Sequence, residues 1–182
     1  MQEHLRQKVF LKTSDQGNRI KNVFPALIGG EFRLKTNQDE IKIMEMNVQE
    51  LIKKALEMRK MSYTPYSHFN VGAALLAANG TVYTGCNIEN ASFTPTNCAE
   101  RTAFFKAVSE GVKEFTAIAV VGGPAGADPV DYCPPCGVCR QVMSEFCHDD
   151  FKIIIAKSVD EYKIVDLNDN LPDRFGPKDL LG

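Results

Sequence analysis

Residues 98–123 read CAERTAFFKAVSEGVKEFTAIAVVGG and join the pattern of an amphipathic helix to that of a buried strand. In the first half, apolar residues recur at the spacing of one helix face: Ala103, Phe104, Ala107 and Val108. Gly111 follows them, as a glycine commonly does at the end of a helix. Residues 115–123 form a short, almost wholly apolar run, which is typical of a strand covered on both faces. This order predicts a helix that packs on a sheet.

Similar patterns precede this stretch. Residues 71–88 carry two apolar runs around Asn79-Gly80, the dipeptide best suited to a tight β-hairpin turn. Further upstream, Asn47 and Glu50 have the spacing of a capping box, and apolar residues at helical spacing follow them. We therefore expect a hairpin and, before it, a helix of about 13 residues that begins at Asn47.

The patterns continue towards the C-terminus. Residues 136–146 predict a helix behind Pro134-Pro135, and residues 151–157 and 161–167 predict two more strands. Strands that alternate with helices of this length favour an α/β fold. We predict a three-layer α/β/α sandwich with a central mixed sheet of about five strands.

The first 45 residues differ from the rest. Short alternating pieces predict strands at residues 8–13, 22–34 and 40–46, with a turn at Gly29-Gly30. The residues of this segment indicate no function.

Composition limits the classes of function. A chain of 182 residues, 44% of them hydrophobic, builds one core, and 21 basic against 23 acidic residues leave a net charge of −2. This balance gives no attraction to a nucleic acid polymer or a membrane. With no apolar stretch long enough for a membrane span or an export signal, we expect a cytoplasmic protein. Its six cysteines then favour thiol or metal roles over a disulfide framework.

Three of these cysteines lie at every third position. In YCPPCGVCRQV, residues 132–142, two C-x-x-C motifs share Cys136. Cys136 and Cys139 are three apart, so in a first helical turn their sulfurs lie on one face, and Cys98 begins the other helix. Three thiolates on a zinc ion leave one coordination position for water, which distinguishes a catalytic site from a closed structural one.

Glu100 and Arg101, which follow Cys98 in the sequence, bear on that chemistry. Three thiolates make the site negative and the bound water a weaker acid, which helix N-termini and a hydrogen bond from Arg101 to a thiolate would offset. Glu100 is near enough to take a proton from the water. From the spacing alone, an ordinary solvated helix position is an equally good interpretation of Glu100.

The motifs together resemble a known family. Cys98-Ala99-Glu100, followed 35 residues after Glu100 by the P-C-x-x-C motif at residues 135–139, resembles the zinc-dependent cytidine deaminases. Further stretches agree: YTPYSHFNVGAALL, GCNIENAS, CRQVMSEF and LPDRFGPKDL. The resemblance runs from about Met46 to the C-terminus, so we expect a deaminase domain at residues 46–182 and an extension of unknown role at residues 1–45.

The resemblance assigns roles to individual residues. It implies one Zn²⁺ per subunit on Cys98, Cys136 and Cys139, with Glu100 as the catalytic acid and base and Arg101 beside the ligands. It implies substrate contacts from five residues: Phe69, Asn87, Glu89, the backbone of Ala99, and Phe175 reaching in from a neighbouring subunit. Without the resemblance, Phe69 reads as a core residue, and Asn87 and Glu89 as residues that turn the chain.

The implied reaction is hydrolytic deamination of cytidine and 2′-deoxycytidine to uridine and 2′-deoxyuridine, with release of ammonia, in pyrimidine salvage. Water activated by zinc attacks carbon 4, while Glu100 takes the water proton, delivers it to ring nitrogen 3 and assists loss of the amino group. The single-domain members with a cysteine as first ligand resemble this chain and are homotetramers. The implied partners are a small-molecule nucleoside and further copies of the chain.

Three other functions remain open at this point. The substrate is a related aminopyrimidine nucleoside in one alternative. In the second, Cys133 and Cys136 form the redox pair of a thiol oxidoreductase. In the third, Cys133 closes the zinc site of a noncatalytic binding module.

The resemblance leaves some features without a function. Since P-C-x-x-C falls on Cys136 and Cys139, Cys133 is expected to be a spectator, and Cys86 and Cys147 to pack as small apolar residues. The loop at residues 93–97 departs from the tyrosine- or glycine-containing loop of the family, so Phe93 is expected to alter the edge of the site. The extension at residues 1–45 is expected to be an extra arm, an added oligomer contact, or the result of translation that starts upstream of the domain.

Overall fold

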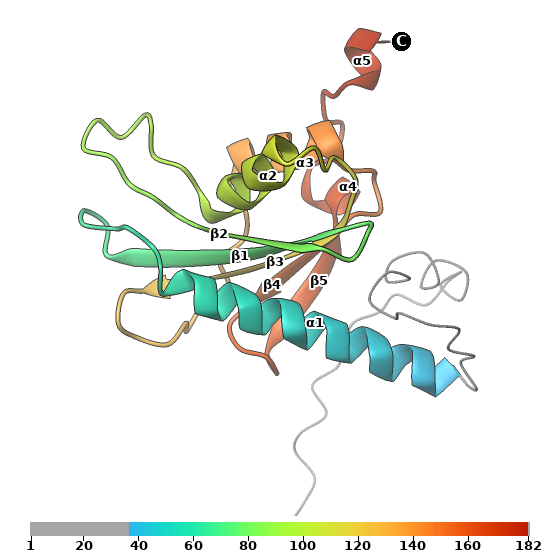
Figure 1. Ribbon diagram of the computed structural model, residues 1–182, viewed down its shortest axis with the longest axis horizontal. Helices are drawn as coiled ribbons and strands as arrows, with labels where there is room; N and C mark the ends of the chain where they lie inside the picture. Colours follow the sequence, from blue (N-terminus) through green and yellow to red (C-terminus); the bar gives the residue numbers. More distant parts are fainter. Residues whose placement is uncertain (1–36, 182) are drawn as a thin grey trace, which may run out of the picture.

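The structure is a computed structural model that describes residues 37–181, with side chains from residue 47 onward (Figure 1). Its elements follow one another in the order α1 (Asn37–Arg59), β1 (Phe69–Ala77), β2 (Val82–Cys86), α2 (Ala99–Ser109), β3 (Phe115–Pro124), α3 (Gly137–Phe146), β4 (Lys152–Ala156), β5 (Tyr162–Asp166), α4 (Leu167–Asn170) and α5 (Lys178–Leu181). In the described residues, no helix is long and apolar enough to cross a membrane.

The five strands form one mixed sheet in the order β2-β1-β3-β4-β5. β3 and β4 are parallel, and the other neighbouring pairs are antiparallel. Figure 1 shows α1 on one face of the sheet and α2 and α3 on the other. The predicted three-layer α/β/α sandwich is therefore confirmed, and so is its mixed sheet.

The core follows from the alternation of side chains along the buried strands. In β3, Ile118 and Val120 pack in the cluster beneath α2 and α3, while Ala117, Ala119 and Val121 pack in the cluster beneath α1. Because successive side chains of a strand point to opposite faces, one apolar run fills both layers. This is why β3 has no polar face in the sequence.

The sequence interpretation fails at the start of the domain. Residues 40–46, predicted as a strand, belong to α1, and the helix begins at Asn37 rather than at Asn47. The capping-box interpretation of Asn47 is therefore wrong. No glycine or proline interrupts residues 37–59, so nothing stops the helix from continuing upstream. The other predicted N-terminal strands, at residues 8–13 and 22–34, lie outside the described residues.

The remaining predicted elements are confirmed. β1 and β2 form an antiparallel hairpin with Gly80 at a φ of 86° in its turn. Gly111, at a φ of 87°, follows the C-terminus of α2. At the other ends, Cys98 and Cys136 are the N-cap residues of α2 and α3.

Two glycines allow the helices to approach the sheet closely. A Cβ at Gly72 would lie 2.0 Å from the backbone oxygen of Ala55 and 2.5 Å from the backbone nitrogen of Arg59, so α1 rests directly on β1. A Cβ at Gly85 would lie 2.3 Å from the backbone oxygen of Ala99, so the first turn of α2 rests directly on β2. The second contact fixes the end of α2 that bears Cys98.

We predict that Gly72→Ala destabilises the protein by about 3 kcal/mol, because the new methyl group meets helix backbone that moves only as a unit. The measurement is the free energy of unfolding in urea. Gly137→Ala is the matched control, since a Cβ at Gly137 meets nothing within 4 Å, and it should be neutral or slightly stabilising. Equal stability of the two variants would contradict the close packing of α1 on β1.

Candidate active site

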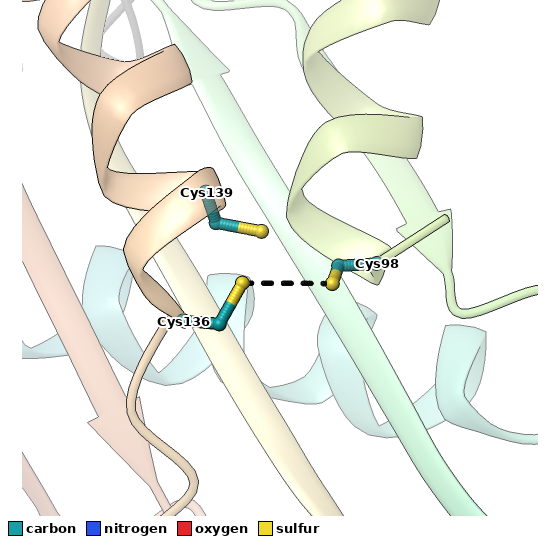
Figure 2. A group of neighbouring side chains, drawn as sticks. All are labelled: Cys98, Cys136 and Cys139. Atoms are coloured by element: carbon teal, nitrogen blue, oxygen red, sulfur yellow. Dashed lines mark hydrogen bonds between the residues drawn. The ribbon is translucent and has the colours of Figure 1, made fainter. Parts of the chain in front are cut away.

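The N-termini of α2 and α3 bring three thiols together (Figure 2). The sulfur atoms of Cys98, Cys136 and Cys139 all lie within 4.8 Å of one another. Cys98 and Cys136 precede the first residues of their helices, and Cys139 lies in the first turn of α3. The structure thus brings together the three residues that the sequence predicted as metal ligands.

The geometry of the thiols fits a zinc ion. Two sulfurs bound tetrahedrally at about 2.3 Å from zinc lie about 3.8 Å apart. The distance between Cys98 Sγ and Cys136 Sγ is 3.8 Å, whereas a disulfide would need about 2 Å. All six cysteines are free thiols. Within the described residues, neither Cys133 nor Glu100 belongs to this group of potential ligands, so three protein ligands are available to an ion.

Positive charge surrounds the Cys98 sulfur. The Cys139 thiol hydrogen-bonds to it and Arg101 donates to it at 3.7 Å, and together they lower the pKa of Cys98 to about 5. Each helix N-terminus adds partial positive charge at its own cysteine. Arg101 is held in place by a second hydrogen bond, 3.0 Å long, to the carbonyl of Thr96. The Cys98 sulfur is therefore favoured as a thiolate before any metal binds.

Glu100 is buried in the first turn of α2, with 4% of its surface exposed. Burial raises the pKa of this carboxyl from 4.5 to about 7, and the charge of Cys98 adds to the effect. The alternative of a solvated helix residue is therefore wrong. A buried carboxyl that titrates near neutrality beside a metal site can both accept and donate a proton at physiological pH.

Phe69 begins β1 and lies opposite Pro124 of β3. Its side chain is 40% exposed, so the core interpretation of this residue is wrong. A Cβ at Gly122 would lie 3.1 Å from the Phe69 ring and 2.6 Å from the Cys133 sulfur, so both side chains border the same point on β3. Ala99, by contrast, is fully buried between Cys98 and Glu100.

Asn87 and Glu89 hold loops while keeping atoms available for a ligand. Asn87 accepts a hydrogen bond from Val71 N at 2.8 Å and donates one to Phe69 O at 2.8 Å. One oxygen of Glu89 accepts hydrogen bonds from Tyr66 N at 2.9 Å and Ser67 N at 3.2 Å. Hydrogen bonds, led by that from the Ser67 side chain, lower the pKa of Glu89. These hydrogen bonds hold the neighbouring loop, and they leave the other carboxylate oxygen of Glu89 and one amide proton of Asn87 for a ligand.

The other predicted residues are not among the three grouped thiols. The Phe175 ring is 59% exposed, and its backbone oxygen accepts a hydrogen bond from Gln141 Nε2 at 2.9 Å. Cys86 and Cys147 are buried, as predicted. Burial raises the pKa of Cys133 to about 11. This opposes the oxidoreductase alternative, which needs a thiol of low pKa.

Sequence reasoning missed Arg59 at the end of α1. Its guanidinium donates hydrogen bonds to the carbonyls of Asn70 (3.1 Å), Pro124 (2.5 Å) and Ala127 (2.8 Å). Arg59 therefore ties α1 to the start of the loop that leads from β3 to Cys136. No periodic signal marks such a residue, because two of its partners lie 65 and 68 positions away.

The fold and the site define a class: an α/β domain with an open three-thiolate zinc site and a buried carboxyl beside it. Residues 45–155 match the family model described as the cytidine and deoxycytidylate deaminase zinc-binding region. The chain belongs to this family and binds one zinc ion per subunit.

Individual relatives agree with the family match. The chain is 48% identical over 135 residues to the cytidine deaminase of Sporosarcina psychrophila, covering 74% of this chain and 96% of that protein. It is also 48% identical over 135 residues to the cytidine deaminase of Halalkalibacterium halodurans, covering 74% and 98%. The crystal structure of the Burkholderia pseudomallei cytidine deaminase superposes with a TM-score of 0.63 at 43% identity, covering 69% of this chain and 97% of that one.

The thiol geometry predicts that Cys136 contributes to zinc binding and that Cys133 does not. Cys136→Ser should lower zinc affinity by at least about 10-fold and reduce the thiolate-to-metal absorbance of the cobalt-loaded protein by about a third, because it removes one of three ligands. Cys133→Ser should change neither quantity. Zinc is measured by metal analysis after dialysis against a chelator. Loss of zinc from the Cys133→Ser variant would contradict this assignment and support the alternative in which Cys133 is a fourth ligand that closes the zinc site.

Proposed function

We propose that this protein is a zinc-dependent hydrolase that converts cytidine and 2′-deoxycytidine to uridine and 2′-deoxyuridine with release of ammonia. The observation that supports this most directly is the convergence of three thiols within 4.8 Å beside the buried Glu100. Family membership and the relatives named as cytidine deaminases point to the same reaction.

Cys98, Cys136 and Cys139 would hold the zinc ion, which would supply a Lewis acid that makes water a better nucleophile at neutral pH. Glu100 would take one proton of the water as its oxygen bonds to carbon 4, and deliver that proton to ring nitrogen 3. It would then carry the remaining hydroxyl proton to the amino nitrogen, so that the bond between carbon 4 and this nitrogen breaks, ammonia leaves and the carbonyl forms. A carboxyl with a pKa of about 7 suits both directions of transfer. Arg101 keeps the Cys98 sulfur anionic through its hydrogen bond.

Four further residues are proposed to hold the nucleoside. The half-exposed face of Phe69 suits the pyrimidine ring, and the backbone of Ala99 lies between a metal ligand and the acid. Asn87 and Glu89 offer an amide and a carboxylate to two neighbouring sugar hydroxyls. Their shared backbone partners in the segment 66–71 support a common role.

We propose that the protein is a homotetramer whose sites are completed across interfaces, with Phe175 contributed by a neighbouring subunit. Exposed large apolar side chains gather in the two loops beside the site: Tyr63, Tyr66, Ile88 and Phe93. Tyr66 and Phe93 pack edge to face with ring centroids 6.1 Å apart. Apolar surface of this kind is typical of an interface. The exposed Phe175 ring is also apolar surface that a neighbouring subunit would bury.

The proposed catalytic domain comprises residues 46–182, preceded by an extension of unknown role at residues 1–45. The family match, which begins at residue 45, supports this division. The boundary falls inside α1, so the extension is continuous with a helix of the domain. We further propose a role in pyrimidine salvage in the cytoplasm.

The reaction is tested by the ultraviolet absorbance change when zinc-loaded protein meets cytidine. We expect turnover with stoichiometric ammonia. Glu100→Ala should keep about one zinc per chain but lower kcat by about 10⁴-fold, because the proton path is lost. Thr116→Val, on β3, is the matched control and should retain activity.

Each outcome decides a separate point. A near-normal rate for Glu100→Ala would overturn its catalytic role. If the zinc-loaded protein leaves cytidine and deoxycytidine unchanged but releases ammonia from another aminopyrimidine nucleoside, the substrate assignment is wrong.

The shared site is tested by mixing two impaired variants. Glu100→Ala chains retain Phe175, and Phe175→Ala chains retain Glu100, so reassembled mixed oligomers should contain some complete sites. In a 1:1 mixture about a quarter of the sites should hold both Glu100 and a neighbour's Phe175. If truncation of the Phe175 ring costs at least about 2 kcal/mol, roughly 30-fold in rate, kcat/KM of the mixture should exceed that of Phe175→Ala by about 7-fold or more. Sedimentation should show a tetramer. A fully active monomer would contradict the assignment of Phe175 to a neighbour's site.

A further inference from the structure

The metal ligand Cys98 occupies the N-cap position of α2, where a polar side chain commonly caps the helix. Cys98 is the N-cap of α2, and within the described residues its side chain makes no capping hydrogen bond. Serine, threonine or aspartate at this position would bind a free backbone N–H of the first turn and stabilise the helix end. Other groups must therefore fix the start of α2.

Asn97 and Thr102 provide such groups from either side of Cys98. Asn97 Nδ2 donates a hydrogen bond to Thr102 Oγ1 at 3.1 Å. Thr102 Oγ1 lies 3.0 Å from the carbonyl oxygen of Cys86 and 3.2 Å from that of Cys98. Since Cys98 O already accepts the helical N–H of Thr102, we assign the hydroxyl proton to Cys86 O. We call this chain of hydrogen bonds, from Asn97 through Thr102 to Cys86 O, the Asn97–Thr102 tie.

The tie ends next to the residues proposed to hold the sugar. Cys86 is the last residue of β2 and directly precedes Asn87. Ile88 forms a two-hydrogen-bond bridge with Asn97, each bond 2.9 Å long. The segment 86–89 is thus attached to the segment 97–102 at two points. Two attachments fix both the separation and the relative orientation of these segments, whereas one would leave a pivot.

Close packing supports the tie at its helix end, whereas little packing supports it at its loop end. A Cβ at Gly85 would lie 2.9 Å from Thr102 Cβ, so Thr102 is pressed against β2. In contrast, the side chain of Ile88 is 45% exposed, and residues 91–95 of the intervening loop are exposed. Burial of apolar surface therefore holds the loop side weakly, and the polar tie carries the alignment.

Resting on the proposed function, we propose that Asn97 and Thr102 are positioning residues for the deaminase reaction. Their tie sets the distance between the metal ligand Cys98 and the sugar-binding residues Asn87 and Glu89. It acts on the reacting geometry without touching the substrate. Breaking it should leave each set of contacts intact while misaligning the base with Glu100, and small misplacements of this kind cost up to about 100-fold in rate.

The test replaces Thr102 with valine, which keeps the shape and removes the hydroxyl. We expect kcat for cytidine to fall about 10- to 100-fold with KM changed less than about 3-fold, and zinc to leave about 10-fold faster for a chromophoric chelator. The cobalt-loaded variant should show an altered visible spectrum. Thr102→Ser should restore all three readouts, because it restores the hydroxyl.

A matched control separates positioning from general stability. Thr116→Val makes the same change on β3, where Thr116 Oγ1 makes a 3.5 Å hydrogen bond to Leu76 O near the end of the strand remote from Phe69. It should leave kcat, zinc release and the cobalt spectrum unchanged whatever its effect on the urea midpoint. The kcat of the double variant Asn97→Ala/Thr102→Val should be within about twofold of that of Thr102→Val, because both changes break the same chain of hydrogen bonds.

The proposal is overturned if Thr102→Val keeps wild-type kcat and zinc release, if Thr102→Ser fails to restore them, or if the effects at positions 97 and 102 add fully. Should the wild-type protein itself not deaminate cytidine, the proposed function fails. Zinc release and the cobalt spectrum would then still decide whether the tie positions Cys98.

Discussion

The meeting of two helix N-termini at one end of the sheet is the constraint on which the rest of the site depends. Parallel strands need a crossover, so α3 connects β3 to β4 and begins where β3 has ended. That end of β3 lies opposite Phe69, the first residue of β1. Because Gly85 lets α2 rest on β2, Cys98 reaches the same place. The strand order and the close contact at Gly85 thus bring the grouped thiols and Phe69, which is proposed to face the substrate, to one end of the sheet.

The electrostatics of the site follow from that meeting. Hydrogen bonding with Cys139 and with Arg101 stabilises Cys98 as a thiolate. Burial raises the pKa of Glu100 to about 7, and the charge of the Cys98 thiolate adds to the effect. One cluster of helix ends therefore prepares both the ligands for a cation and a proton carrier that works near neutral pH.

Loops around the site are held by polar contacts rather than by core packing. Asn87 and Glu89 bind backbone groups of the segment 66–71, and Arg59 binds three carbonyls. Tyr66 and Phe93 remain exposed on these loops. Polar anchoring gives a defined geometry while apolar surface stays available for a nucleoside or another subunit.

Much of the site could be predicted from the sequence, because helical spacing alone puts Cys136 and Cys139 on one face, and β3 is apolar apart from Thr116. The strand assigned to residues 40–46 failed because a short alternating run also fits a helix. The burial of Glu100, the separation of Cys133 from the thiol group and the contact of Thr102 with Cys86 were decided only by the tertiary structure. Each depends on packing between elements distant in the chain, and local spacing does not record which face of a helix its neighbours cover.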